Sequence, residues 1–219
     1  MVHNVPMRLV LASASPARRA TLIAAGITPI VQVSTPADEV AALAAAKCTD
    51  VCEALSAPDT NAELPEGEAV LVVGCDSMLE IDGQMLGKPH TPDVARERIR
   101  AMRRTTATLW TGHSAAILAP ASSNDGTAHE RTISAPVTRS ASTQVHFGDI
   151  SDAEIDAYVA TGEPLHVAGS FTVDGLGGPF IEGVTGDYHS VVGISLPLLR
   201  SMAIELGVFW PDLWDAPRP

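Results

Sequence analysis

Two hydroxyl side chains, a proline and two arginines near the start of the chain form a pattern that suits anion binding. The apolar run 7–12 is typical of a buried strand, and the sequence continues as Ser13-Ala14-Ser15-Pro16. Ser15 is a good N-cap and Pro16 fits a first helical turn, so we expect a sharp turn from strand to helix. The exposed N–H groups at such a helix start attract a phosphate group.

Arg18 and Arg19 are expected in the first turn of that helix, where a positive charge is unfavourable unless an anion is bound. Arginine forks grip phosphate oxygens, so a bound phosphate would remove the penalty. An ordinary capped helix with solvated arginines explains the same residues equally well. The segment is not a P-loop, because it lacks a glycine-rich run that ends in Gly-Lys-Ser or Gly-Lys-Thr.

Asp76 and Lys88 supply further groups that phosphoryl chemistry uses. The apolar run 69–74 predicts a buried strand, and Asp76 is expected at its C-terminal end, where α/β proteins place their sites. Such a carboxylate can bind a divalent metal ion or take a proton from water. Asp82-Gly83 predicts a hairpin that returns the chain, so Lys88 is expected near Asp76. A loop aspartate that caps backbone N–H groups is the alternative interpretation of Asp76.

The remaining polar candidates are weaker. Asp38-Glu39 follows the expected second strand and could add a metal ligand, although solvated loop charges are the simpler interpretation. His146, His166 and His189 are dispersed and do not have the spacing of metal ligands. The chain has no serine nucleophile elbow with an accompanying histidine and aspartate.

Length and charge limit the class of protein. A chain of 219 residues with 46 % hydrophobic residues suits one large domain, or two lobes around one cleft. Its formal net charge of −12 argues against a protein that coats nucleic acid or an anionic membrane. The N-terminus has no signal-peptide pattern and no apolar run is long enough to span a bilayer, so a cytoplasmic protein is expected. Phosphate must then be bound locally, by a few placed cations and a metal ion.

The three cysteines, Cys48, Cys52 and Cys75, argue against a secreted disulfide scaffold, because their number is odd and their spacing forms no framework. Cys48 and Cys52 lie close together in an expected helix. We interpret them as small apolar residues on one helix face. A metal site there would need further ligands that the sequence does not show.

Strand and helix patterns alternate along the chain, which predicts an α/β fold with a mixed sheet. Ser151-Asp152-Ala153-Glu154 is a capping box, and Gly162 ends the helix that it starts. The segment 119–136 is expected to be a long polar loop, and 169–193 a glycine-rich region with short strands. Strands are expected at 7–12, 30–33, 69–74, 78–81, 84–86, 109–118 and 140–147, and helices within 15–26, 40–55, 91–104, 151–162 and 195–207.

An ordered series of motifs resembles the Maf proteins, a family of nucleoside triphosphate pyrophosphatases once named for septum formation. Leu11-Ala12-Ser13-Ala14-Ser15-Pro16-Ala17-Arg18 is similar to the family's opening Leu-Ala-Ser-x-Ser-Pro-x-Arg. Each motif is weak alone, but their order over nearly the whole chain is specific. The others are Asp38-Glu39, Leu43-Ala44-Ala45-Ala46-Lys47, Cys75-Asp76-Ser77, Leu86-Gly87-Lys88-Pro89, Gly162-Glu163-Pro164, Ala168-Gly169, Phe180-Ile181-Glu182 and Val191-Val192-Gly193.

The resemblance implies a single domain over residues 1–219, with a mixed twisted sheet and flanking helices in two lobes around a cleft, like that of inosine triphosphate pyrophosphatases. It implies a hydrolase that converts a nucleoside triphosphate to a nucleoside monophosphate and pyrophosphate, with non-standard or modified nucleotides among the candidate substrates. A divalent metal ion, either magnesium or manganese, and a homodimer are also expected.

The resemblance also assigns roles to single residues. Asp76 falls on the position of the proton acceptor, and Asp76 and Glu39 fall on positions expected to bind the metal ion. The residues on positions expected to bind the phosphates of the substrate are Ser13, Arg18, Lys47 and Lys88.

Three positions, Ala17, Ser77 and Asp174, match those that sort the family by the base of its substrate. Members that prefer pyrimidines commonly have Arg, Thr and Gln there, and members that act on 7-methyl-GTP commonly have Trp, Ser and Glu. Ser77 and the acidic Asp174 are closer to the second pattern, whereas Ala17 matches neither. An acidic side chain can accept hydrogen bonds from a guanine-type N–H edge.

One departure from the family pattern supports a competing hypothesis. His166-Val167 stands where the family usually has Asp-Lys, so a lysine that could contact phosphate is missing. This departure favours a nucleotide-binding regulator of cell division and septum formation with little catalytic activity. A general phosphatase, which would release orthophosphate instead of pyrophosphate, is the third hypothesis.

Overall fold

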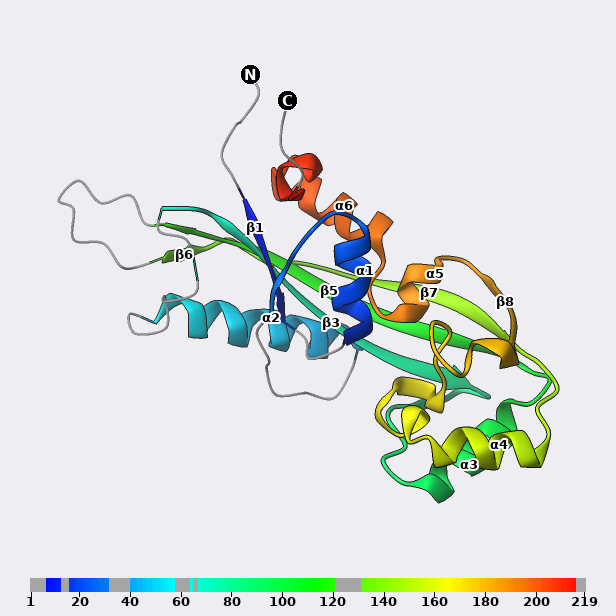
Figure 1. Cartoon of the computed structure of the whole chain (residues 1–219). Helices are drawn as coiled ribbons and strands as arrows, with labels where there is room; N and C mark the ends of the chain where they lie inside the picture. The colour runs from blue at the N-terminus through cyan, green and yellow to red at the C-terminus, as the bar shows by residue number, and fades with distance from the viewer. Residues whose placement is uncertain are drawn as a thin grey trace. The chain divides into compact units, whose positions relative to one another are not determined.

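A computed structural model describes residues 7–12, 16–31, 40–57, 64, 67–120 and 131–215 (Figure 1). The chain divides into two compact units, each built from segments that are far apart in the sequence. Unit 1 consists of Met1–Asp76, Gly112–Arg139 and Leu196–Pro219, and unit 2 consists of Ser77–Thr111 and Ser140–Ser195.

The strands form a mixed sheet, as the alternation of elements predicts. Their order is β2-β1-β3-β5-β7-β8, with β4 paired to β3 and β6 paired to β5. β1 pairs in parallel with β2 and β3, whereas β3/β4, β5/β6 and β7/β8 are antiparallel. The strands are β1 (Arg8–Ala12), β2 (Ile30–Val31), β3 (Val70–Ile81), β4 (Gln84–Leu86), β5 (Thr106–Pro120), β6 (Arg131–Ile133), β7 (Val137–Phe147) and β8 (Ile181–Thr185).

The helices lie close to the ranges expected from sequence and confirm the α/β class. In the described part of the chain, none of them is both long enough and apolar enough to cross a lipid bilayer. They are α1 (Pro16–Ala24), α2 (Val40–Ser56), α3 (Pro92–Met102), α4 (Asp152–Ala160), α5 (Tyr188–Val192) and α6 (Leu196–Glu205), with the short 3-10 helices η2 (Glu163–His166), η3 (Ala168–Ser170), η4 (Gly178–Phe180) and η5 (Trp210–Leu213).

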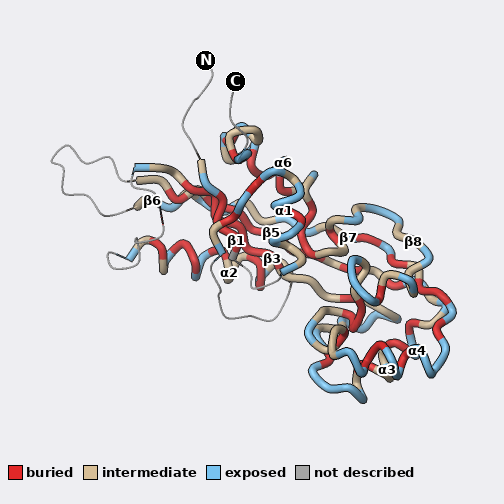
Figure 2. The backbone as a smooth tube through the Cα atoms, viewed as in Figure 1, coloured by how far each residue is buried: buried red, intermediate tan, exposed pale blue. Residues whose placement is uncertain are grey.

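Unit 1 has an aliphatic core between its strands and α2. Val10 of β1 pairs with Val72 of β3, and both residues are fully buried. Cys48 and Cys52 lie on the buried face of α2 in the same cluster, which confirms that they act as small core residues. Figure 2 shows buried backbone along β1, β3 and part of α2.

Two glycines of the sheet let the backbone of α2 approach the strands directly. A Cβ atom on Gly74 of β3 would lie 2.3 Å from the carbonyl oxygen of Ala44. A Cβ atom on Gly112 of β5 would lie 2.2 Å from the carbonyl oxygen of Val40. Both distances are far below van der Waals contact, so any side chain at either position would push α2 away from the sheet.

Unit 2 has its own core, formed by α3, α4 and the strands that they cover. Phe147 of β7 packs edge-on against Phe171, with ring centroids 5.0 Å apart. The predicted capping box is present at the start of α4: Ser151 accepts from Glu154 N, and the Glu154 carboxylate accepts from Ser151 N. These two hydrogen bonds satisfy backbone donors that a helix start would otherwise leave open.

The third strand is longer than the sequence predicts. β3 runs over Val70–Ile81, so the expectation that Asp76 stands at the end of a strand is wrong, and Asp76 lies in the middle of one. The strand continues because its first half pairs with β1 and its last residues pair with β4. The predicted hairpin turn is confirmed: Asp82 and Gly83 both have positive φ, 49° and 76°, as two-residue turns between antiparallel strands commonly require.

Two further segments differ from expectation. β6 lies within the segment expected to be a polar loop, because it pairs with the end of β5, which reaches Pro120. The glycine-rich segment 169–193 contains β8 and α5 with 3-10 turns, rather than several short strands. The side chain of Asp187 accepts from His189 N and so starts α5.

We predict that Gly112→Ala lowers the free energy of unfolding by about 2 kcal/mol, because the added methyl group collides with the backbone of Val40. Urea unfolding followed by circular dichroism measures the change. Gly87→Ala is the matched control, because a Cβ atom at Gly87 meets nothing within 4 Å. Equal losses of stability in the two variants would contradict direct contact between α2 and the sheet.

Candidate active site

Among the described residues of unit 1, Asp76 and Lys47 form the shortest ion pair. The Nζ atom of Lys47 donates to Asp76 Oδ1 at 2.5 Å and to the carbonyl oxygen of Cys75 at 3.2 Å. The two side chains are only 11 % and 20 % exposed, so water screens their attraction less than it screens a surface pair. Helix α2 therefore delivers its cation to the middle of β3.

Arg18 adds a second positive charge beside this strand. Its charge and that of Lys47 act on Cys75, the residue before Asp76. Burial nevertheless dominates and raises the pKa of the Cys75 thiol to about 12, although the two cations lower it. Cys75 is therefore a neutral thiol at physiological pH, and the acidic side chain that pairs with Lys47 is that of its neighbour Asp76.

The site is also notable for where the chain places its lysines. Lys47 and Lys88 are the only two lysines in the sequence, in a protein whose formal net charge is −12. Both fall in motifs expected to bind phosphate. Such a chain can attract a triphosphate only where a few cations are concentrated.

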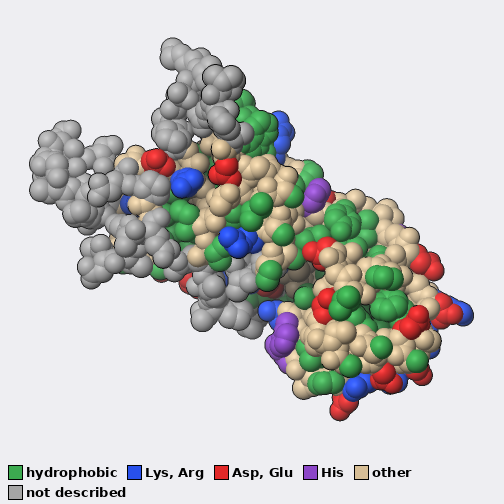
Figure 3. Space-filling model, in the orientation of Figure 1, with side chains coloured by type: hydrophobic (Ala, Val, Ile, Leu, Met, Phe, Trp, Pro, Cys, Tyr) green, Lys and Arg blue, Asp and Glu red, His purple; other side chains and the backbone are tan. Residues whose placement is uncertain are grey.

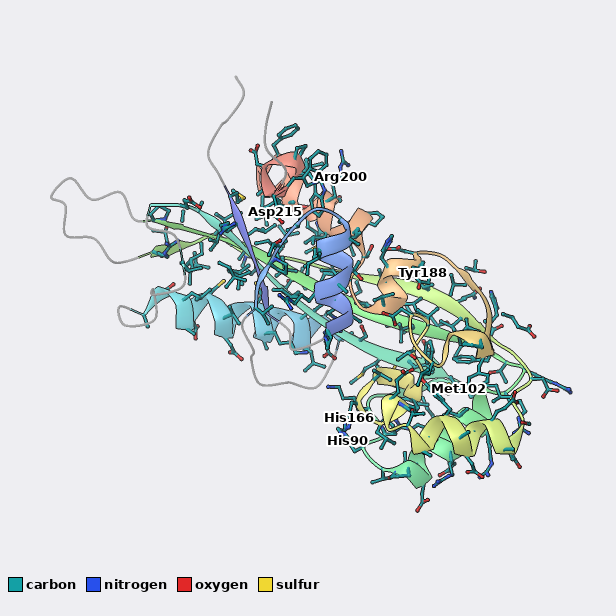
Figure 4. The ribbon with its side chains drawn as sticks, in the orientation of Figure 1. His90, Met102, His166, Tyr188, Arg200 and Asp215 are labelled. Carbon is teal, nitrogen blue, oxygen red and sulfur yellow. The ribbon has the colours of Figure 1, made fainter. Side chains whose placement is uncertain are left out.

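Lys88 belongs to unit 2, and hydrogen bonds hold the backbone on both sides of it. Arg98 of α3 donates to the carbonyl oxygen of Gly87 at 2.7 Å, and His90 N donates to the carbonyl oxygen of Leu165 at 3.2 Å. Figure 4 shows the labelled side chains of His90 and His166 close together in this region. The Lys88 side chain is exposed, so it is available to an anion, and the expected approach of Lys88 to Asp76 stays a prediction.

Of the three expected base-sorting residues, Ala17 and Ser77 take part in hydrogen bonds, and Asp174 is exposed. The carbonyl oxygen of Ala17 accepts from Thr21 in α1. Ser77 Oγ lies 2.9 Å from Thr111 Oγ1, which donates to the carbonyl oxygen of Ser190 at 3.0 Å. Asp174 is exposed in the segment between Thr172 and Gly177.

Sequence reasoning missed Arg98, Thr111 and Ser190, which hold these site residues. Arg98 is separated from Gly87 by the start of a helix, and Ser190 is 79 residues from Thr111. No local pattern connects such pairs. Ser13 and Glu39, which the resemblance assigns to phosphate and metal binding, lie outside the described residues, and so does Asp38.

The chemistry of the site fits a metal ion that is bound together with a phosphate. Within the described residues, no group of three or more His, Cys, Asp or Glu side chains could hold a metal ion by itself. Magnesium in nucleotide sites is usually held by one or two carboxylates together with substrate phosphates. Asp76 offers such a carboxylate, because Lys47 engages Oδ1 and Oδ2 remains able to bind a cation.

The chain is similar to known proteins over nearly its whole length. The family model described as Maf-like protein matches residues 8–206. A nucleoside triphosphate pyrophosphatase of Saccharopolyspora erythraea is 46 % identical over 226 residues, covering 96 % of this chain and 99 % of the relative. Proteins of the same name from Streptomyces avermitilis and Salinispora tropica are each 47 % identical, and each alignment covers 98 % of this chain, with 98 % and 91 % of the relative respectively.

We predict that the two lysines differ in their effect on stability. Lys47→Met leaves the partly buried Asp76 carboxylate without its cation, so the free energy of unfolding should fall by about 1–2 kcal/mol. Lys88→Met removes an exposed side chain, so the change should stay within about 0.5 kcal/mol. Urea unfolding at pH 7 without nucleotide measures both, and equal stabilities would show that the Lys47–Asp76 pair contributes nothing.

Proposed function

Because the chain belongs to the Maf-like protein family, we propose that it hydrolyses a nucleoside triphosphate between the α- and β-phosphates. The products are a nucleoside monophosphate and pyrophosphate, and the enzyme is a hydrolase that acts on acid anhydrides. The observation that carries the proposal is the partly buried ion pair of Lys47 with Asp76, next to Cys75, on which the charge of Arg18 also acts. The names of the relatives support the same activity.

Asp76 is the proposed proton acceptor. Lys47 donates to Oδ1 and so fixes the orientation of the carboxylate, which accepts a proton from the attacking water. The water oxygen forms a bond to the α-phosphorus. The bond between the α-phosphorus and the bridging oxygen breaks, and pyrophosphate leaves with that oxygen. The held geometry of the carboxylate lowers the cost of arranging base and water.

The cations are proposed to bind the charged end of the substrate. Arg18 offers a planar fork that matches phosphate oxygens, and Lys88 offers a compact charge on an exposed side chain. Both stabilise the charge that develops on the leaving pyrophosphate. Ser13 is proposed to add a hydroxyl donor to the same phosphates.

Asp76, with Glu39, is the proposed holder of a divalent ion, magnesium or manganese. Enzymes of this kind generally depend on a metal ion. The carboxylate of Asp76 fits a metal ion that is also bound by the phosphates of the substrate. When bound, such an ion polarises a phosphate oxygen and lowers the pKa of a bound water.

The substrate, the oligomeric state and the location of the protein are also proposed. A net charge of −12 supports a small nucleotide substrate rather than nucleic acid or an anionic membrane. A homodimer is proposed from the family resemblance, and a cytoplasmic location is proposed from the sequence alone. Ser77 and Asp174 support a guanine-type base, such as that of 7-methyl-GTP, over a pyrimidine.

We predict that Asp76→Asn reduces kcat by about 10²–10⁴-fold, because an amide cannot take the proton of the attacking water. The fold should persist, since the Asn Oδ1 atom can still accept from Lys47. Release of pyrophosphate measures the loss. Asp50→Asn, on an exposed position of α2, is the control that should keep wild-type activity. Near-normal turnover by Asp76→Asn would exclude its role as the base.

A panel of purine, methylated and pyrimidine nucleoside triphosphates separates the candidate functions. An enzyme of the proposed kind releases pyrophosphate from at least one of them. Binding without release would instead support the regulator of cell division, the hypothesis that His166-Val167 favours. Release of orthophosphate as the first product would support a general phosphatase.

A further inference from the structure

Glu163 is a carboxylate that the proposed hydrolysis does not use, yet it organises a whole segment of unit 2. It begins η2, and the backbone N–H groups of Leu176 and Gly177 donate to its two oxygens, each at 3.2 Å. The hydroxyl groups of Tyr158 and Thr172 also donate to it. We call the segment 172–177 the Glu163 turn, because its ends close on this one side chain.

The Glu163 turn closes tightly at two of its glycines, and at Gly177 the close contacts include a backbone atom. A Cβ atom on Gly175 would lie 2.9 Å from Glu163 Oε1. A Cβ atom on Gly177 would lie 2.6 Å from the Tyr158 hydroxyl and 2.6 Å from the carbonyl oxygen of Thr172. The turn therefore has its shape because it wraps around the carboxylate and the phenol.

Tyr158 anchors this arrangement to the core of unit 2. Its side chain is buried and packs against Phe180, with ring centroids 5.7 Å apart. Its hydroxyl accepts from Thr172 N at 3.1 Å while it donates to Glu163. Burial raises the pKa of Tyr158, so the phenol stays protonated and keeps its donor.

The charge of Glu163 is stable at neutral pH. Burial raises its pKa, but the hydrogen bonds from Thr172, Leu176, Gly177 and Tyr158 together lower it below the ordinary value. Glu163 is therefore ionised and acts only as an acceptor, which is what the donors around it require.

The anchored turn presents two side chains to solvent. Asp174 is exposed, and Leu176 is 58 % exposed although it is a large apolar residue. A carboxylate beside an apolar side chain complements a flat base whose edge carries N–H donors. Guanine has such an edge, with its ring N–H and its exocyclic amine, whereas the corresponding edge of a pyrimidine such as uracil offers a single N–H between two carbonyl groups.

We propose that Glu163 is a positioning residue that holds the turn so that Asp174 accepts from the donor edge of a guanine-type base and Leu176 contacts its ring. This inference rests on the proposed function, because it assigns the base end of the nucleotide substrate to the turn. Glu163 does not touch the substrate. It fixes the backbone that carries Asp174, so binding loses less conformational freedom.

The decisive variant is Glu163→Gln. An amide keeps the shape but replaces one acceptor oxygen with a donor, so at least one of the N–H and O–H groups around it loses its acceptor. For guanosine triphosphate, KM should rise about 10-fold with kcat within about 3-fold, since the lost contact serves binding rather than chemistry. The preference for guanosine over uridine triphosphate should fall by a similar factor.

Asp174→Asn should lower the same preference without changing the fold, since its side chain is exposed. In the double variant Glu163→Gln with Asp174→Asn, the two effects should not add, because both act through one contact. Glu154→Gln is the matched control: it weakens the capping box of α4 and lowers stability, and it should leave the preference unchanged. If Glu163→Gln does not fold, Tyr158→Phe tests the same arrangement from the donor side and should also lower the preference.

Binding of α,β-methylene analogues of guanosine and uridine triphosphates, measured by calorimetry, separates this inference from the proposed function. Weaker binding of only the guanosine analogue by Glu163→Gln supports the inference even if wild-type protein releases no pyrophosphate. Wild-type affinity that is equal for both analogues overturns it. The inference is also overturned if the Glu163→Gln protein keeps the wild-type preference for the guanosine analogue. The proposed hydrolysis is unaffected by that result as long as the wild-type protein releases pyrophosphate.

Discussion

The approach of the α2 backbone to two glycines of the sheet is the constraint on which the candidate active site depends. Gly74 and Gly112 leave no room for a side chain against Ala44 and Val40, so the helix lies directly on β3 and β5. From that position Lys47 reaches Asp76 across 29 residues of sequence. A helix held farther away by even one methyl group would carry Lys47 with it, and the carboxylate would lose the donor that orients it.

Electrostatics explains why so few charges are concentrated here. The chain is strongly acidic and has only two lysines, so its average field repels a triphosphate. Lys47 and Arg18 add positive charge beside β3 and so make the local field less repulsive to a triphosphate. Partial burial there limits screening by salt. Between α3 and α4, opposite charges form pairs: Arg96 pairs with Asp156 and Arg103 with Asp152, where Figure 3 shows acidic and basic side chains interspersed.

Unit 2 uses carboxylates to shape backbone rather than to perform chemistry. Glu154 and Asp187 each accept from backbone N–H groups at the start of a helix. Glu163 does the same for a turn, and the cost of partly burying its charge is offset by the N–H and O–H groups that donate to it. An acidic composition is therefore compatible with a nucleotide enzyme, since several of its carboxylates are structural.

The sequence by itself determined what is local. The Asp82-Gly83 turn and the Ser151–Glu154 capping box depend on neighbouring residues, and both are present as predicted. The ordered motifs identified the family, because each is a short pattern that can be read without the fold. Only the tertiary structure decided that Asp76 lies within a strand, that Lys47 pairs with it, and that Glu163 closes a turn around itself. These outcomes depend on pairing and packing between segments far apart in the chain, and such contacts leave no periodic signal in the sequence.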